Sequence, residues 1–499
     1  MTMTRKTFLQ SGAATVAMSA APSLGLGATI RGTPKDTLLT DAIVLTMDAE
    51  RRAYHSGYVW LRDDRIFRVG PMNELGQLPD GITHRALNRR LIMPGLVNCH
   101  THLSNGILRG IYDEMPLEVW FAKGMWPVLD SLDARAAEAA ADLSLLELMN
   151  TGVTTTASGE IPAAHPDMID AVLTSVARSG IRAVVSRIAM DSADDSSGAQ
   201  FIPPAYRDQP QFAADEVRRL QKRFNSARIR VVPEALGVLR CTPEMIKNLH
   251  AVAVDSDTLF TMHAASSQDE RDESRRRFGH GSITELESMG VLGPKTLLAH
   301  AIWLDDREIA SLAERQTGVS HNPVSNAYYA SGVSRLPQLL AAGVRVGIGV
   351  DGASTNNSQN VWESMKMAML FQKQHLEQAS FGSAELALEL MTRGGAAALH
   401  MQDQIGSLEA GKLADLIVID IDRPALAPTQ TIISNLVYSN DPWAVRDVYV
   451  DGQLRVSDGR HTALSSDAII RNARSALAGI LARSGLDDYL SKRSRWQWR

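Results

Sequence analysis

The sequence predicts an α/β protein: a (β/α)8 TIM barrel with a composite β-sandwich domain built from both ends of the chain. Three observations carry this prediction. Eight short apolar runs alternate with helical stretches through the middle of the 499 residues. Further strand-like runs stand before and after them. Polar residues follow the ends of several of the eight runs, where a barrel of this class gathers its reacting groups.

The flanking runs account for the β domain, because each is short, apolar and bounded by turn residues, as strands are. They cover 37–47, 56–64 and 65–70 before the barrel, and 412–421, 445–452 and 453–457 after it. We therefore expect a chain divided into an export leader at 1–32, a first part of the sandwich at 33–92, the barrel at 93–405, a second part of the sandwich at 406–460 and a helical tail at 461–499.

The central runs supply the barrel strands. The segment LIMPGLVNC at 91–99 is expected to form one buried strand that ends at His100. The eight expected strands lie within 94–100, 152–158, 181–190, 229–236, 257–264, 295–302, 317–323 and 344–352. Amphipathic stretches such as 134–152 and 213–224 separate them, and this alternation is typical of parallel strands joined by helices.

Five polar side chains stand at strand ends and predict a metal site. His100 and His102 point to the same side because side chains alternate along a strand. His263, His300 and Asp351 each end a later strand. The carboxyl ends of the strands meet at one mouth of the barrel. Imidazoles with a carboxylate are ligands that a catalytic zinc site uses, so we expect them to converge on a metal.

Composition narrows the classes of protein. A net charge of −5, 44% hydrophobic residues and 21% charged residues are typical of a globular protein and give no sign of a nucleic-acid partner. No apolar run reaches the roughly 18 residues that a membrane span needs. Cys99 and Cys241 are too few for a disulfide framework, and we expect both to be core residues.

The first 32 residues have the layout of an export signal: a basic start, a mildly apolar Ala-rich stretch and small residues at the end. Residues 4–10 resemble a twin-arginine signal with Lys6 in place of the second arginine. We therefore expect a periplasmic or exported protein. The alternative is a cytoplasmic protein with a disordered N-terminal tail.

Four segments resemble the amidohydrolase superfamily. They are PGLVNCHTHL at 94–103, SHNPVSN at 320–326, GIGVDGASTNN at 347–357 and IGSLEAGKLADLIVID at 405–420. The branch they resemble holds methylthioadenosine/adenosylhomocysteine deaminases, other aminohydrolases of nitrogen heterocycles and triazine chlorohydrolases. The resemblance implies a metal-dependent hydrolase that acts on carbon–nitrogen bonds, other than peptide bonds, of a small molecule.

The resemblance also implies the roles of the strand-end residues. His100, His102, His263 and Asp351 would bind one divalent metal ion, zinc, with iron as the alternative. His300 would hydrogen-bond the activated water or the developing oxyanion. Asp351 would take the proton of that water and pass it to the leaving group. No lysine ends a middle strand to bridge a second metal, so we expect a mononuclear site.

One position departs from the family pattern. Deaminases of this branch carry a glutamate three residues after the histidine that corresponds to His263, and here Ser266 stands in that place. A hydroxyl can orient a group or donate a hydrogen bond, but it cannot act as a carboxyl acid at neutral pH. Asp269 or Glu270 reaching into the site is an alternative. Ser266, with Asp351 and His300, is a candidate catalytic residue.

Ser266 leaves several reactions open. Hydrolysis of an amide, urea or carbamate needs less acid assistance than deamination of an amino-heterocycle. One alternative is a dehalogenase or thiolester-type hydrolase that expels chloride or thiolate. Another is a catalytically weak member that only binds a small molecule.

Substrate contacts are expected from aromatic and polar side chains near the mouth. The alternative is packing on the barrel for the two tryptophans, a scaffold role for the two glutamates, and a structural role in holding the loop near His300 for His321 and Asn322. The candidates are Trp120, Trp126, Glu160, Glu234, His321, Asn322 and Tyr328. We also expect a homo-oligomer, a dimer or larger, because barrels of this kind often pair.

Overall fold

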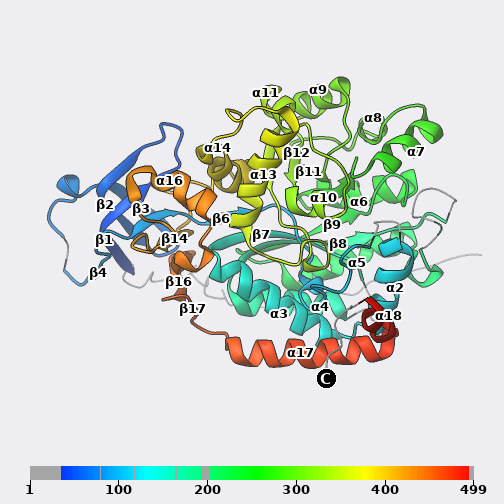
Figure 1. Cartoon of the computed structure of the whole chain (residues 1–499), viewed down its shortest axis with the longest axis horizontal. Coiled ribbons are helices and arrows are strands. Elements are labelled where there is room, and N and C mark those ends of the chain that lie inside the picture. The colour runs from blue at the N-terminus through cyan, green and yellow to red at the C-terminus, as the bar shows by residue number, and fades with distance from the viewer. Residues whose placement is uncertain are drawn as a thin grey trace, which may run out of the picture. The chain divides into compact units, whose positions relative to one another are not determined.

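The computed structural model describes residues 35–493, apart from 79, 116–118, 163–166, 194–199 and 201. The expected leader at 1–32 lies outside the described residues. Within them, the chain forms an eight-stranded parallel sheet and a separate nine-stranded mixed sheet, which lie side by side in Figure 1. No helix of this part of the chain combines the length and the apolar character needed to cross a membrane.

The parallel sheet closes into the predicted barrel. Its strands follow chain order, and the backbone N–H of Cys99 after the first strand donates to the carbonyl of Ile348 on the last (3.0 Å). All eight residues of β7 and of β8 are buried, as expected where helices cover the sheet. The strands are β6 (Leu96–Asn98), β7 (Val153–Glu160), β8 (Arg182–Ala189), β9 (Ile229–Ala235), β10 (Phe260–Ala264), β11 (Thr296–His300), β12 (Gly318–His321) and β13 (Arg345–Ile348).

Helices surround the barrel, as Figure 1 shows. The longer ones are α3 (Ala134–Asn150), α4 (Met168–Ser179), α5 (Pro210–Phe224), α6 (Pro243–Asp255), α7 (Gln268–Phe278), α9 (Asp306–Glu314) and α13 (Val361–Leu376). Shorter ones are α2 (Trp126–Ser131), α8 (Ser282–Ser288), α10 (Pro323–Tyr328), α11 (Leu336–Ala341), α12 (Ala353–Asn356), α14 (Ala384–Glu389), α15 (Gly395–Ala398) and α16 (Ile432–Ser434). The C-terminal helices α17 (Ser466–Ser484) and α18 (Leu486–Arg493) follow, and α17 packs along α3.

The mixed sheet joins both ends of the chain, as predicted. Its strands are β1 (Asp36–Leu45), β2 (Ala53–Arg62), β3 (Arg65–Pro71), β4 (Thr83–Ala86), β5 (Leu91–Pro94), β14 (Leu416–Ile419), β15 (Val445–Val450), β16 (Gln453–Ser457) and β17 (Arg460–His461). Antiparallel pairing of β5 with β14 joins the two halves. Buried residues of both halves, such as Leu39, Val59 and Leu416, share one apolar core. The short strands β4 and β17 were not predicted from the sequence.

The run 91–99 differs from the prediction of one strand. It is divided into β5 of the mixed sheet and β6 of the barrel, with Gly95 between them. The N–H of Gly95 donates to the carbonyl of Asp415 (3.0 Å), and a Cβ added at this glycine would overlap the side chain of Thr154. The split was not visible in the sequence because both halves are equally apolar and buried.

A buried ion pair also connects the two sheets. The guanidinium of Arg182, on β8, donates from Nε and Nη2 to the carboxylate of Asp415 (2.9 and 3.2 Å) and from Nη2 to Asp451. Arg182 and Asp415 are almost fully buried. The barrel is therefore fixed to the mixed sheet by charge as well as by the continuous backbone at Gly95.

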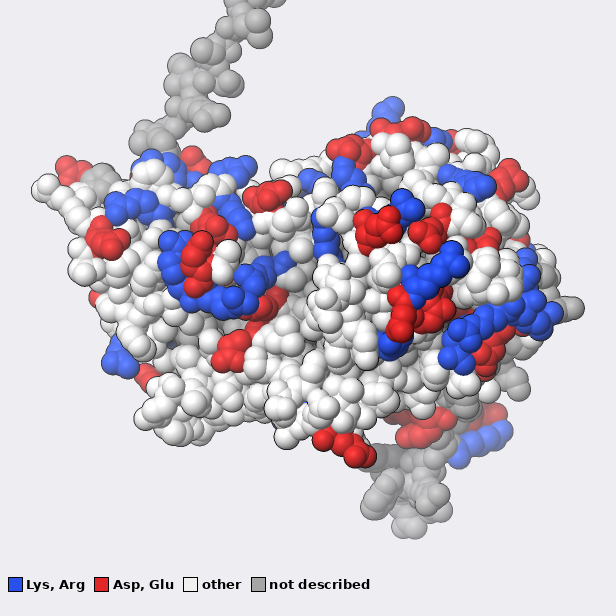
Figure 2. All heavy atoms as spheres, turned by 90° about the horizontal axis from the view of Figure 1, so that it is seen from above, with Lys and Arg blue, Asp and Glu red and all other residues white. Residues whose placement is uncertain are grey.

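The surface carries both signs of charge. On the face in Figure 2, basic and acidic groups adjoin one another in several clusters. Ion pairs also form on α5, where Arg219 pairs with Glu216 of the same helix (3.1 Å) and with Asp170 of α4 (2.7 Å).

Candidate metal centre

The first and last barrel strands hold His100 next to Asp351. The carbonyl oxygen of His100 accepts from the backbone N–H groups of Val350 (3.1 Å) and Asp351 (2.9 Å). The backbone of Asp351 is left-handed, with φ of 63°. A non-glycine residue rarely adopts this conformation, and such residues cluster at functional sites. The backbone thereby directs the carboxylate to the mouth of the barrel.

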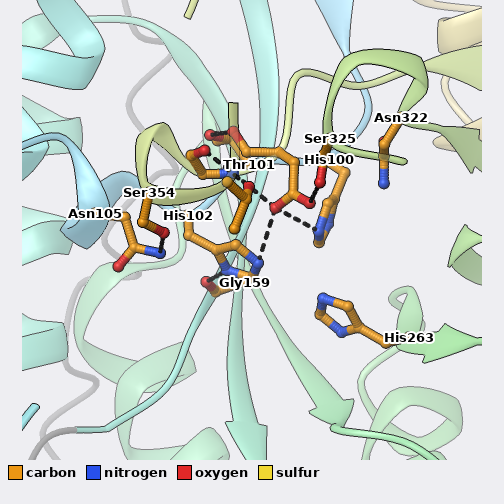
Figure 3. Close-up of polar contacts among 12 residues, drawn as sticks. His100, Thr101, His102, Asn105, Gly159, His263, Asn322, Ser325 and Ser354 are labelled. Atoms are coloured by element: carbon orange, nitrogen blue, oxygen red, sulfur yellow. Dashed lines mark hydrogen bonds and ion pairs between the residues drawn. The ribbon is translucent and has the colours of Figure 1, made fainter. Parts of the chain in front are cut away.

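The carboxylate of Asp351 lies among three imidazoles. Its Oδ1 is 3.6 Å from Nε2 of His100 and 3.4 Å from Nε2 of His102, and its Oδ2 is 3.8 Å from Nε2 of His300. The hydroxyl of Ser325 donates to Oδ2 (2.6 Å). In Figure 3, His100, His102 and His263 face the same space.

Hydrogen bonds on the far ring nitrogens orient two of these histidines. Nδ1 of His102 lies 2.5 Å from the carbonyl oxygen of Gly159, so this nitrogen carries the proton. Nδ1 of His263 lies 3.0 Å from Oε1 of Glu234. Burial lowers the pKa of His263, but the Glu234 carboxylate outweighs this effect and raises it. In both rings the contact at Nδ1 leaves Nε2 as the ligand atom.

His300 is held in the same way by an amide. Its Nδ1 lies 2.9 Å from Oδ1 of Asn326 and 3.4 Å from Nδ2 of Asn322. The shorter contact requires a proton on Nδ1, so Nε2 of a neutral His300 presents a lone pair to the site. His300 also has a left-handed backbone, with φ of 76°.

The residues fit a divalent metal ion. His100 Nε2 is buried and has no hydrogen-bond partner among the described residues. Two groups of ligand atoms lie within 4.8 Å of one another, His100 with His263 and His300, and His100 with His102 and Asp351. Bonds of about 2.1 Å around a tetrahedral ion place ligand atoms about 3.4 Å apart, close to the separations of Asp351 Oδ1 from the two imidazoles. The set forms a site for a divalent metal.

The protonation states also suit a metal. Burial would raise the pKa of the Asp351 carboxyl, but the neighbouring imidazoles of His100, His102 and His300 outweigh it and hold that pKa well below its usual range. Burial lowers the pKa values of His100 and His300. A carboxylate among neutral imidazoles is the form in which these groups bind a metal.

A pocket opens over these residues. His102, His263, His300 and Asp351 form its floor. Apolar and aromatic side chains form part of the wall: Trp120, Met125, Leu129, Ile161, Leu236 and Tyr329. Polar side chains such as Asn105, Arg240 and Thr355 line the rest. The ring centroids of Trp120 and Tyr329 lie 6.1 Å apart. Apolar walls combined with polar groups that orient a ligand are typical of a small-molecule site.

Ser266 lines this pocket, but the carboxylate of Glu270 does not. Glu270 is buried behind Ser266 and accepts the hydrogen bond of its hydroxyl (2.6 Å). The sequence left open whether Glu270 reaches into the site. In the structure its carboxylate contacts Ser266 and does not itself line the pocket.

The other predicted substrate contacts lie outside the pocket lining, apart from Trp120. Trp126 is buried with its ring 5.0 Å from that of Tyr206, and the hydroxyl of Tyr328 donates to Asp113. Glu160 accepts from the backbone N–H groups of Leu103 (2.9 Å) and Ser104 (3.2 Å). These contacts favour the packing alternative for Trp126, Tyr328 and Glu160.

Glu234 and Asn322 support the site from behind. Glu234 contacts His263, and Asn322 accepts from Ser320 (2.9 Å) while facing His300. Their places indicate positioning of the histidines rather than contact with a substrate. His321 is buried in β12 and lines a second cavity beside α10 instead of the pocket over the histidines.

Sequence reasoning assigned no role to Ser325 or Asn326. Ser325 holds Asp351, and Asn326 holds His300. Both stand in the SHNPVSN segment at the start of α10, so the segment itself was the signal. Their individual partners depend on how α10 packs against β11 and β13, which no local pattern reveals.

The fold and the site together define a metal-dependent hydrolase of the (β/α)8 class. Residues 91–455 match the model of the Amidohydrolase family. The 5-methylthioadenosine/S-adenosylhomocysteine deaminase of Nitratidesulfovibrio vulgaris is 33% identical over 89% of this chain and 97% of its own length. The 5'-deoxyadenosine deaminase of Methanopyrus kandleri is 32% identical over 86% and 96%. The chain belongs to the amidohydrolase family.

Solved structures share the fold. An adenosine deaminase from Xanthomonas campestris with bound zinc superposes with a TM-score of 0.83 at 24% identity, covering 90% of this chain and 99% of that one. The zinc complex of atrazine chlorohydrolase from Arthrobacter aurescens gives a TM-score of 0.81 at 22% identity, covering 88% and 100%. At these identities, the likeness supports the barrel and the mixed sheet.

Proposed function

We propose that the protein is a mononuclear zinc hydrolase that cleaves a C–N bond of a small amide, urea, carbamate or amino-heterocycle. The single observation that carries the proposal is the convergence of His100, His102 and Asp351, with His263 facing the same space. The zinc-bound neighbours in structure and the named deaminase relatives support it.

The proposed mechanism assigns His100, His102, His263 and Asp351 to the metal. A divalent ion held there would polarise a carbonyl oxygen and lower the pKa of a water molecule toward neutrality. Asp351 Oδ2, oriented by Ser325, accepts the proton of the attacking water and delivers it to the leaving nitrogen. His300 Nε2 accepts a hydrogen bond from the same water and fixes its direction of attack.

The pocket supports a small substrate with an apolar or planar part. Trp120 and Tyr329 line the pocket together with His102, His263, His300 and Asp351. Ser266 in place of a carboxyl favours a substrate whose reacting carbon already carries an oxygen, because a carbonyl needs no acid at a ring nitrogen.

A substrate panel tests this proposal. Zinc-loaded protein is incubated with amino-heterocycles, phenylureas and carbamates, and release of ammonia or amine is measured. Chelation should abolish turnover, and added zinc should restore it. Asp351→Asn should lower kcat by at least about 100-fold, as loss of a proton-transfer group does. Turnover that survives complete chelation would contradict the metal mechanism.

Export and assembly remain proposals. The layout of residues 1–32 supports export as a folded protein, and the division of the chain at 32, 92, 405 and 460 is proposed with it. N-terminal sequencing of secreted protein and light scattering of the purified chain test the export and the homo-oligomer.

A further inference from the structure

Ser266 connects the pocket to a buried carboxylate. Its backbone N–H (2.9 Å) and its hydroxyl (2.6 Å) both donate to Oε2 of Glu270. The N–H of Ala265 (2.7 Å) and the hydroxyl of Ser282 (2.8 Å) donate to Oε1. Four donors therefore surround the two carboxylate oxygens. This arrangement satisfies an ionised carboxylate, which can only accept.

The direction of the Ser266–Glu270 hydrogen bond fixes what Ser266 offers to a ligand. A serine hydroxyl has one proton and two lone pairs. The proton of Ser266 is donated to Glu270, whereas Ser266 itself lines the pocket. Toward the pocket, the hydroxyl oxygen is therefore an acceptor and not a donor.

The acceptor stands beside the reacting groups. Ser266 follows His263 by three residues at the end of β10, and both line the pocket together with Asp351 and His300. A substrate whose reacting carbon lies over the metal ligands thus places a neighbouring atom against Ser266. An N–H there makes a hydrogen bond, whereas an unprotonated ring nitrogen would meet oxygen lone pairs.

We propose that Ser266 Oγ, fixed as an acceptor by Glu270, selects substrates that carry an N–H next to the reacting carbonyl. The substrate class is then a secondary amide or lactam, a urea, a carbamate or an oxo-heterocycle. The inference rests on the proposed function and narrows its substrate class. Ser266 is a specificity residue. Glu270 is the positioning residue, because it accepts the hydroxyl proton of Ser266 and so leaves the oxygen as an acceptor toward the pocket.

The test compares two ligands of the same shape. The lactam 3,4-dihydro-2-quinolinone has one N–H beside its carbonyl, and 2-tetralone has a CH2 in that place. Dissociation constants are measured by calorimetry with zinc-loaded protein. We expect the wild-type protein to bind the lactam about 10- to 100-fold more tightly, as expected when a buried group is otherwise left unpaired.

Variants then assign the preference. Ser266→Ala should reduce the ratio of the two constants to within about threefold, and Ser266→Thr, which keeps the hydroxyl, should restore it. Glu270→Gln should also reduce the ratio, because the amide N–H can donate to Ser266 and turn its proton toward the pocket. Ser282→Ala is the matched control: it removes another donor to Glu270 outside the pocket and should leave the ratio unchanged.

The outcomes separate this inference from the proposed function. A wild-type ratio near one, a ratio that Ser266→Ala leaves unchanged, or failure of both ligands to bind would overturn the inference. C–N hydrolysis accompanied by such a ratio leaves the proposed function intact. Conversely, a ratio that collapses in Ser266→Ala without any hydrolysis supports the N–H selection and contradicts the proposed function.

Discussion

Oε1 of Glu234 lies 3.0 Å from Nδ1 of His263, so a carboxylate on β9 orients a proposed metal ligand on β10. Glu234 is itself fixed by the hydroxyls of Ser186 and of Thr261 (3.0 Å). A carboxylate in this position fixes the tautomer of the histidine and makes it a stronger ligand.

Glu234→Gln should therefore weaken zinc binding by about 10- to 100-fold, because the neutral amide holds the imidazole less strongly. Competition with a chromophoric chelator measures the affinity. Glu160→Gln is the comparison, since Glu160 is equally buried but holds backbone N–H groups instead of a ring. Equal losses of zinc affinity in both variants would contradict an orienting role for Glu234.

Removal of the buried Arg182 side chain should destabilise the whole fold. Arg182→Ala leaves the buried carboxylate of Asp415 without its cation, and breaking such a buried pair costs about 3–5 kcal/mol. The melting temperature should fall accordingly. Arg218, a half-exposed arginine that pairs with the exposed carboxylates of Asp215 and Asp255, is the matched control, and its alanine variant should lose about 1 kcal/mol or less.

His321 should make stability depend on pH. Burial lowers the pKa of His321 to about 4, against about 6.5 in an unfolded chain. Between these values the unfolded state binds a proton that the folded state does not. Stability should therefore fall as the pH decreases from 6.5 to 4, by about 1.4 kcal/mol per pH unit.

His321→Asn removes that contribution. The melting temperature of the variant, measured across this range, should fall less steeply than that of the wild-type protein, and the difference between them should be constant above about pH 8. Metal ligands titrate in both proteins, so the difference isolates His321. Parallel curves would show that His321 does not titrate on unfolding.

Tyr329 should contribute to turnover. Tyr329 lines the pocket. Its hydroxyl is buried and has no hydrogen-bond partner among the described residues. Burial raises the pKa of this phenol far above its usual range, so it stays a donor. Tyr329→Phe should lower kcat/KM by about 10-fold, the value of one hydrogen bond.

Tyr328→Phe gives the comparison for Tyr329. The hydroxyl of Tyr328 donates to Asp113 and lies outside the pocket lining. A larger loss of kcat/KM in Tyr328→Phe than in Tyr329→Phe would contradict this prediction. It would show that Tyr328, the candidate from the sequence, makes the substrate contact.

The barrel could be predicted from the sequence because its signal is local and repeated. Each of the eight apolar runs coincides with one observed barrel strand, although β7 extends two residues beyond its run, and the polar residues at the run ends include the three histidines that lie around Asp351. In a barrel of this class the carboxyl ends of all strands lie at the same mouth, so residues at separate strand ends could be expected to lie close together. No long-range contact had to be known in advance.

The supporting residues could not be predicted in the same way. Glu234 and Trp126 were both candidates for substrate contact, yet one holds a ligand and the other packs on Tyr206. A glutamate at a strand end or a tryptophan in a helix has the same local pattern in either role. The difference arises from the packing of neighbouring strands and helices, which brings together residues far apart in the sequence.

Gly95 makes the two sheets share one uninterrupted stretch of extended chain that runs directly to His100. A one-residue deletion between 91 and 99 would have no loop in which to be absorbed. It would either break the pairing of β5 with β14 or turn both histidines away from Asp351, because strand faces alternate with every residue. The number of residues between 91 and 99 is thus constrained as strictly as the identity of the two histidines that follow.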